Sequence, residues 1–180
     1  GIAAPQPFLT TFSGDASLSK RPMGRVIRPL ATMGAKIVGR DNNQRLPITV
    51  IPAAKKLQGL TYDMPVASAQ VKSALLLAGL YALGDTTVEE PFASRDHTER
   101  MLTAFGVAVE KWGTVVTVHP AAKLKAPDLI DVPGDISSAA YWLVAGSIIP
   151  DSELLLRNVG INPTRTGIID VLRDMGADIE

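Results

Sequence analysis

The stretch that decides the fold runs from residue 68 to residue 83 and reads Ser68-Ala69-Gln70-Val71-Lys72-Ser73-Ala74-Leu75-Leu76-Leu77-Ala78-Gly79-Leu80-Tyr81-Ala82-Leu83. Its beginning is polar, and from Ala74 onward nearly every side chain is apolar. A helix that is apolar on all sides is a buried helix, and this stretch is too short to span a bilayer. Ser68 is a good N-cap. The sequence therefore predicts a core helix whose N-terminus alone reaches a surface or a cleft.

The start of this helix gathers groups that can hold an anion. A helix N-terminus has backbone N–H groups without intrahelical partners and carries a partial positive charge. Ser68, Gln70 and Lys72 add a hydroxyl, an amide and an ammonium group there. Together these groups indicate a site for a phosphate or a carboxylate. An ordinary capped helix is the alternative, and it is favoured when the helix is considered alone, so the choice depends on the rest of the chain.

The composition limits the classes of protein and of site. The 180 residues suffice for one large domain or for parts of two, and 46% hydrophobic with 5% aromatic residues indicates an aliphatic core. Basic and acidic residues number 18 each, so charge does not argue for nucleic acid or membrane binding. The absence of cysteine excludes disulfides and thiolate sites, and two histidines exclude a histidine-rich metal site. We expect a soluble, cytoplasmic protein.

Three segments of the chain share one pattern. Each reads as a helix end, closed by a glycine in the left-handed conformation and followed by a short β-like run. The segments are Leu30–Ala35, Leu102–Val107 and Leu172–Ala177, and their glycines are almost evenly spaced along the chain. The 68–83 helix also has a counterpart, Ser137–Gly146, whose glycine follows the equivalent one at nearly the same spacing. The repeating unit is therefore the segment that runs from the glycine of one helix-end motif to the glycine of the next.

This repeat predicts the class of fold. It reads as a buried helix, a strand, a second helix that ends in glycine, and then two or three strands. The predicted strands include Thr86–Glu90, Val115–His119 and Leu154–Arg157. Alternating helices and strands predict an α/β or α+β fold. The period exceeds those of the common solenoids, so we expect globular repeats that share a core.

The repeat also predicts the domain organisation. Pro133-Gly134 interrupts the pattern just before the third repeat, so we expect residues 1–132 in a first lobe and residues 133–180 at the start of a second. Gly1 falls inside the counterpart of a first helix, and Glu180 stops where the third repeat should begin its strands. We therefore expect an internal fragment whose first lobe holds part of one repeat plus one full repeat.

Basic side chains precede the second helix of the first repeat. Arg21 stands just before a helix that Pro22 can start, beside Lys20 and near Arg25. The side chains and the helix dipole both place positive potential there, and arginine can grip a carboxylate or phosphate with two hydrogen bonds. A solvated basic face is the alternative interpretation.

Four motifs carry a resemblance to a known family. They are Lys20-Arg21-Pro22-Met23-Gly24-Arg25, Ser68-Ala69-Gln70-Val71-Lys72, Arg95-Asp96-His97-Thr98-Glu99 and Asn162-Pro163-Thr164-Arg165. In this order they resemble the 5-enolpyruvylshikimate-3-phosphate synthases, or 3-phosphoshikimate 1-carboxyvinyltransferases, and the resemblance covers essentially the whole chain. The sequences of these four motifs are similar to those of the bacterial, glyphosate-tolerant class II enzymes of this family.

The resemblance implies a fold and an activity. Each of two lobes would contain three βαβαββ repeats around buried parallel helices, an inside-out barrel that is incomplete in this chain. The implied transferase reaction moves the enolpyruvyl group of phosphoenolpyruvate to the 5-hydroxyl of shikimate 3-phosphate, in the shikimate pathway of aromatic amino acid biosynthesis. It implies no metal and no organic cofactor, no nucleic-acid or membrane partner, and a full-length enzyme that is a cytoplasmic monomer.

The resemblance also implies roles for particular residues. Arg21 matches a phosphoenolpyruvate-binding arginine. Ser68, Ala69 and Gln70 match contacts to shikimate 3-phosphate, with Gln70 also near phosphoenolpyruvate, and Arg95 matches a further contact to shikimate 3-phosphate. Many relatives have a second serine where this chain has Ala69, so a contact there would use the backbone. No catalytic acid or base of the family falls within these residues, so we expect half a cleft at most and no activity from the chain alone.

Two alternatives stay open at this point. One is the related enolpyruvyl transferase that acts on UDP-N-acetylglucosamine, which usually carries a reactive loop cysteine, whereas this chain has no cysteine. The other is a non-catalytic repeat domain that binds phosphorylated ligands or a partner protein. The resemblance implies that the family's lysine-bearing segment and its catalytic carboxylates lie outside this chain, and a full-length sequence that supplied them would favour the enzyme.

Overall fold

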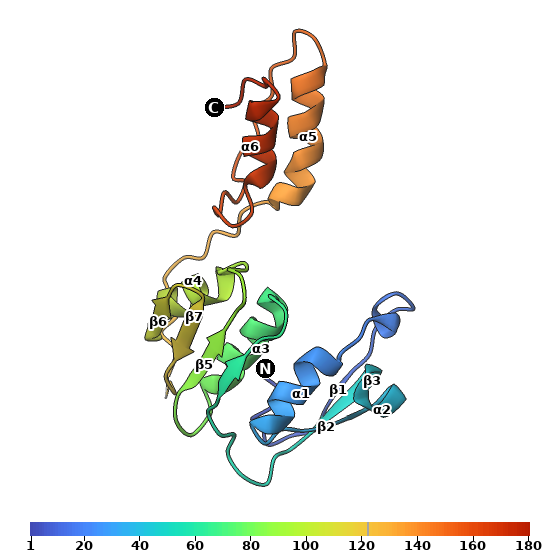
Figure 1. The fold of residues 1–180 in the computed structure, drawn as a ribbon, viewed down its shortest axis with the longest axis vertical. Coiled ribbons are helices and arrows are strands. Elements are labelled where there is room, and N and C mark those ends of the chain that lie inside the picture. Colours follow the sequence, from blue (N-terminus) through green and yellow to red (C-terminus); the bar gives the residue numbers. More distant parts are fainter. Residues whose placement is uncertain (122) are drawn as a thin grey trace. The chain divides into compact units, whose positions relative to one another are not determined.

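A computed structural model describes residues 1–121 and 123–180 (Figure 1). The chain divides into two compact units, residues 1–127 and residues 128–180. This division lies slightly before the lobe boundary expected between residues 132 and 133. That lobe boundary stays a prediction.

A complete βαβαββ repeat fills the second half of the first unit. Its elements are β4 (Thr61–Asp63), α3 (Ala69–Gly79), β5 (Thr86–Glu89), α4 (His97–Ala104), β6 (Val109–Trp112) and β7 (Val115–Val118). They form a sheet of order β4-β5-β7-β6, in which β4 and β5 are parallel and the other pairs are antiparallel. Helix α3 is the crossover between the parallel strands, as such a connection requires. The predicted mixed α/β class is confirmed, and the sheet does not close into a barrel.

The first half of this unit holds a three-stranded antiparallel sheet of order β1-β3-β2. The elements are β1 (Thr10–Phe12), the 3-10 helix η1 (Leu18–Lys20), α1 (Gly24–Thr32), β2 (Lys36–Gly39), α2 (Arg40–Asn43) and β3 (Arg45–Ile51). The turn between β2 and β3 places Asp41, Asn42 and Asn43 at φ of 51°, 53° and 65°. Aspartate and asparagine tolerate this left-handed region better than other non-glycine residues, so the sequence Asp-Asn-Asn suits the turn.

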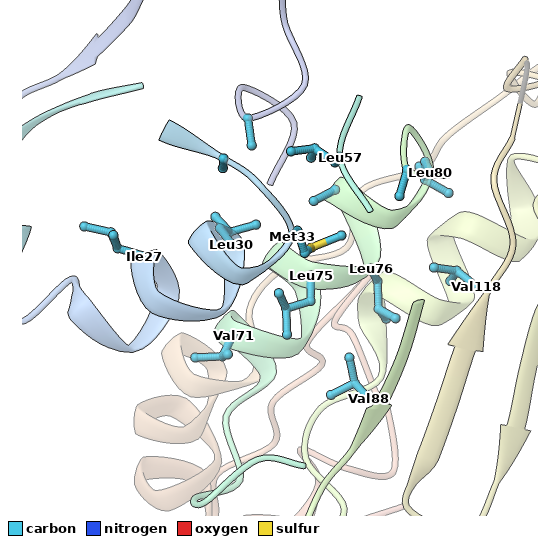
Figure 2. Close-up of a cluster of buried hydrophobic side chains, with 14 of the residues drawn as sticks. Ile27, Leu30, Met33, Leu57, Val71, Leu75, Leu76, Leu80, Val88 and Val118 are labelled. Atoms are coloured by element: carbon cyan, nitrogen blue, oxygen red, sulfur yellow. The ribbon is translucent and has the colours of Figure 1, made fainter. Parts of the chain in front are cut away.

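The core of the first unit lies around α3, with α1 packed beside it (Figure 2). Leu75 and Leu76 of α3 have no exposed surface, and Leu30 of α1 is almost as deeply buried. Val88 of β5 and Val118 of β7 complete the contact from the sheet. Each such side chain contributes about 1.5–3 kcal/mol of burial free energy. The helix is apolar on nearly all sides because neighbours surround it on nearly all sides.

The three predicted helix ends share one geometry. Gly34, Gly106 and Gly176 have φ of 102°, 79° and 95°. In each case the N–H of the residue after the glycine donates to the carbonyl of the leucine that opens the motif, at 2.9–3.0 Å. This is the hydrogen bond of a Schellman motif. The repeat that the sequence predicts is therefore present at these helix ends in both units.

The second unit contains α5 (Ile136–Ile148) and α6 (Gly167–Asp174). The predicted strand Leu154–Arg157 is wrong, because a strand needs a hydrogen-bonded neighbour. The described residues of this unit supply only an isolated parallel bridge between Gly134 and Val159. Within this unit α5 keeps large apolar side chains exposed, including Tyr141 at 80% and Ile148 at 72%.

None of the helices in the described residues combines the length and the apolar character that a membrane span would require.

His119, which follows β7, lies between two carboxylates. Its Nδ1 is 2.8 Å from Asp85 Oδ1 and its Nε2 is 3.1 Å from Glu110 Oε1. The hydrogen bond to Asp85, followed by that to Glu110, raises the pKa of His119 above 6.5.

This raised pKa predicts a pH-dependent stability. The stabilisation is fully present below pH 6.5, the value of the unfolded chain, and is lost as the pH rises through the higher pKa of the folded state. We expect the urea midpoint of the chain to fall as the pH is raised from about 6 through the pKa that His119 has in the folded state. In His119→Asn this part of the fall should be missing, and an identical fall in the variant would contradict the prediction.

Candidate functional site

The N-terminus of α3 has the form that the sequence predicts. Ser68 is the N-cap, with an extended backbone at φ −155° and ψ 104°, and its Oγ accepts from the N–H of Val71 at 3.5 Å. The carbonyl of Ser68 accepts from Lys72 N at 3.0 Å, which starts the helical ladder. The first N–H groups of the helix, at Ala69 and Gln70, have no acceptor within the helix. They remain available to an anion.

Helix α1 supplies a guanidinium group to the same place. Arg25 Nη2 donates to Gln70 Oε1 at 2.5 Å, although the two residues are 45 positions apart. Gln70 therefore presents its carbonyl oxygen to Arg25, and this orients its amide nitrogen. The sequence placed Arg25 only in the basic segment around Arg21, so this contact was missed. Neither residue carries a local signal that could have paired them.

Lys72 corrects one expectation about this helix start. Its side chain is only 2% exposed, so its ammonium group does not reach the N-terminal surface. Nζ donates to Glu90 Oε2 at 2.7 Å and lies 2.7 Å from Glu99 Oε1 in an ion pair. Burial alone would lower the pKa of Lys72, but the two carboxylates outweigh burial and raise it above the ordinary value. The sequence shows only that Lys72 is polar. The direction of its side chain is set by Glu90 and Glu99, and the sequence motifs do not pair these two residues with Lys72.

Arg95 is exposed in the loop just before α4. The loop and the start of α4 are tied to α3 and β5. Ser94 N donates to Glu90 Oε2 at 3.4 Å, and the hydroxyls of Ser73 and Thr98 are 2.6 Å apart. Asp96 is the N-cap residue of α4, but its carboxylate pairs with Arg100 at 3.0 Å and forms no capping hydrogen bond with the helix backbone.

Arg21 follows η1 and is also exposed. Two arginines of the β2–β3 hairpin hold the backbone before it, since Arg40 donates to the carbonyl of Ser19 at 3.2 Å and Arg45 to that of Lys20 at 3.0 Å. Among the described residues no hydrogen bond or ion pair joins Arg21 to Ser68, Gln70 or Arg95. The structure thus brings Gln70 to Arg25, and it leaves the roles of Arg21, Ser68, Ala69, Gln70 and Arg95 as predictions.

The second unit has a different arrangement at the start of α5. Asp135 is the N-cap and accepts from Ser137 N at 3.0 Å, while Arg165 donates to Asp135 Oδ1 at 3.0 Å and to Ser137 Oγ at 2.5 Å. Ser137 and Arg165 border a cavity of about 470 Å³ whose wall is otherwise apolar, formed by Ile136, Ala140, Tyr141, Val144 and Ile168. Arg165 therefore holds the helix N-terminus of its own unit through two hydrogen bonds, whereas Arg95 is exposed.

The described residues contain no group of three or more histidine, cysteine, aspartate and glutamate side chains that could hold a metal ion.

Comparisons with known proteins agree with this architecture. A family model described as EPSP synthase (3-phosphoshikimate 1-carboxyvinyltransferase) matches residues 1–180. The chain is 57% identical over 180 residues to the 3-phosphoshikimate 1-carboxyvinyltransferase of Bacillus subtilis, with all of this chain and 41% of that protein covered. It is 56% identical over 179 residues to that of Thermoanaerobacter pseudethanolicus, covering 99% of this chain and again 41% of the relative.

A solved structure of EPSP synthase from Acinetobacter baumannii is also similar. It superposes with a TM-score of 0.87 at 48% sequence identity, over 98% of this chain and 39% of that one. The chain thus spans about two fifths of the length of the relatives that it matches. With the family model matched over all 180 residues, the chain belongs to the EPSP synthase family.

Proposed function

We propose that the protein containing this chain transfers the enolpyruvyl group of phosphoenolpyruvate to the 5-hydroxyl of shikimate 3-phosphate, a step of aromatic amino acid biosynthesis. The observation that carries the proposal is the family match over residues 1–180. The 5-hydroxyl oxygen gives up its proton as it bonds to the enolpyruvyl carbon, and the methylene carbon takes a proton and becomes a methyl group. The tetrahedral intermediate then loses phosphate together with one proton of that methyl group, which restores the double bond. Both substrates are anionic, so the site needs fixed positive groups and N–H donors.

The N-terminus of α3 would bind shikimate 3-phosphate. Ser68 and Gln70 offer side-chain donors, Ala69 offers its backbone N–H, and Arg95 adds an exposed guanidinium from the loop before α4. The 2.5 Å contact from Arg25 supports this role, because it fixes the carbonyl end of Gln70 and leaves the amide N–H₂ for the ligand. The helix dipole favours negative charge at this end.

Arg21 would bind phosphoenolpyruvate. The contacts that Arg40 and Arg45 make to the two carbonyls before it support this role, because they hold the backbone that carries the guanidinium group. Such a contact to a carboxylate or phosphate uses two parallel hydrogen bonds.

The full-length protein would work as a cytoplasmic monomer with neither metal nor organic cofactor, and without nucleic acid or membrane. The equal numbers of acidic and basic residues in this chain support the last two points. Light scattering after size-exclusion chromatography tests the oligomeric state.

An assay of phosphate release by the full-length protein tests the function. We expect product from phosphoenolpyruvate with shikimate 3-phosphate and none with UDP-N-acetylglucosamine as acceptor. The chain of 180 residues alone should form no product, because the family resemblance implies that the acid–base groups lie outside these residues. Release of phosphate with UDP-N-acetylglucosamine only would assign the related transferase instead.

The substitution Arg21→Lys tests the assignment of this residue in the full-length enzyme. Lysine keeps the charge but loses the planar fork, so the KM for phosphoenolpyruvate should rise far more than that for shikimate 3-phosphate. A lost charge-assisted contact of this kind costs roughly 1.5–3 kcal/mol. Steady-state kinetics with each substrate varied in turn measures the difference. Equal effects on the two KM values would remove the assignment.

A further inference from the structure

The segment that carries Arg95 is anchored to the first turns of α3 on both sides of the arginine. On its N-terminal side, Glu90 Oε2 accepts a hydrogen bond from Ser94 N at 3.4 Å. The same oxygen accepts from Lys72 Nζ at 2.7 Å. The N–H group next to Arg95 is therefore connected to α3 through one carboxylate.

On the C-terminal side of Arg95, the first turn of α4 meets α3 directly. Lys72 Nζ lies 2.7 Å from Glu99 Oε1, and the hydroxyls of the adjacent residues Ser73 and Thr98 are 2.6 Å apart. Lys72 therefore contacts the anchors on both sides of the arginine. It is the residue common to them.

The burial of this cluster excludes direct contact with a substrate. The side chains of Lys72, Glu90 and Glu99 are 2%, 2% and 6% exposed. The ammonium charge of Lys72 already faces two carboxylates, so it has no role in neutralising a phosphate. A charged cluster that is closed to solvent but linked to exposed binding groups on both sides can act by fixing their separation.

We propose that Lys72, Glu90 and Glu99 are positioning residues that set the distance between Arg95 and the Ser68–Gln70 turn, and so determine the affinity for shikimate 3-phosphate. This rests on the proposed function, in which these two groups bind the same ligand. Lys72, in the first turn of α3, lies four residues after the N-cap Ser68, and Glu99, in the first turn of α4, lies four residues after Arg95 in the preceding loop. The buried contact therefore lies close behind the two binding groups.

The cluster holds one ammonium group and two carboxylates, and this decides which substitutions to use. Glu99→Leu removes the link to α4 and leaves a neutral Lys72–Glu90 pair. Glu90→Leu releases Ser94 and leaves a neutral Lys72–Glu99 pair. Neither change leaves an unpaired charge in the core, so each full-length variant should retain its fold.

Steady-state kinetics of the full-length enzyme test the proposal. We expect Glu99→Leu and Glu90→Leu to raise the KM for shikimate 3-phosphate by about 10- to 100-fold, with a much smaller change in that for phosphoenolpyruvate. Glu99→Gln, whose carbonyl can still face Lys72, should restore part of the loss. Val118→Ala is the matched control, because Val118 is fully buried on β7 and takes no part in the cluster. It should lower stability and leave both KM values unchanged.

The outcomes separate this proposal from the one on which it rests. An unaltered full-length protein that forms no product would overturn both. An active enzyme whose two leucine variants keep the normal KM for shikimate 3-phosphate would overturn only the positioning role. The same conclusion would follow if Val118→Ala raised this KM as much as the leucine variants do. If Glu99→Leu is insoluble, the double variant Ser73→Ala/Thr98→Val cuts the neighbouring link without touching a charge. It should raise the same KM, and an unchanged value would again overturn the positioning role.

Discussion

Replacing Lys72 with methionine should lower the free energy of unfolding of the chain by about 3–5 kcal/mol. Methionine fills a similar volume, so the loss is electrostatic rather than a matter of packing. Glu90 and Glu99, at 2% and 6% exposure, would remain in the core without their shared cation. Urea unfolding followed by circular dichroism measures the change, and a loss this large approaches the whole stability of many domains.

A triple variant serves as the control for this prediction. Lys72→Met/Glu90→Leu/Glu99→Leu replaces the whole cluster by apolar side chains of similar volume, and such a replacement of buried ion pairs is often neutral or stabilising. We expect the triple variant to regain most of what Lys72→Met loses. A triple variant as unstable as the single one would show that the side-chain shape of Lys72, rather than its charge, is what the core requires.

Gly59→Ala adds only one methyl group, yet it should lower the free energy of unfolding by about 2 kcal/mol. A methyl group there would overlap the carbonyl oxygen of Asp85 and lie 2.6 Å from that of Gly84. Both neighbours are backbone atoms and cannot rotate away. The N–H of Gly59 donates to the Leu83 carbonyl at 2.9 Å, so the two segments would separate and lose this bond as well. The reduced entropy of the unfolded chain offsets only about 0.4–1 kcal/mol.

Gly167→Ala provides the comparison for this change. Gly167 begins α6, and an added methyl group there would meet no atom within 4 Å. Alanine has the higher helix propensity, so this variant should keep or slightly raise stability. Denaturation curves of both variants report the two effects, and a Gly59→Ala midpoint equal to that of the parent chain would contradict the clash.

The parts of the fold that depend on local sequence were predictable. Helix α3 is capped by Ser68 as expected, and the three glycine ends were found because a Schellman motif involves only a few consecutive residues. The strand expected at Leu154–Arg157 failed for the opposite reason. Its residues have a β-like composition, but a strand exists only if another segment pairs with it, and this cannot be read from the segment itself.

The residues of the candidate site were more predictable than the contacts that they make. Motifs singled out the start of α3 and the segment before α4. The direction of the Lys72 side chain, however, depends on Glu90, which follows β5, and on Glu99, which lies in α4. The Arg25–Gln70 contact spans 45 positions. One sequence contains no information about which distant partner a polar side chain selects, so such pairs require the structure.

The parallel pairing of β4 with β5 has a consequence for the order in which the first unit folds. Its register joins Thr61 to Thr87 with the whole of α3 between them, so a long stretch of chain must be closed when the two strands meet. The β2–β3 hairpin joins Gly39 to Ile48 across a much shorter length of chain. Closing a short loop costs less entropy and takes less time than closing a long one. We expect the hairpin to form early and the β4–β5 pair late, so that core substitutions in β5 mainly accelerate unfolding and leave the refolding rate nearly unchanged.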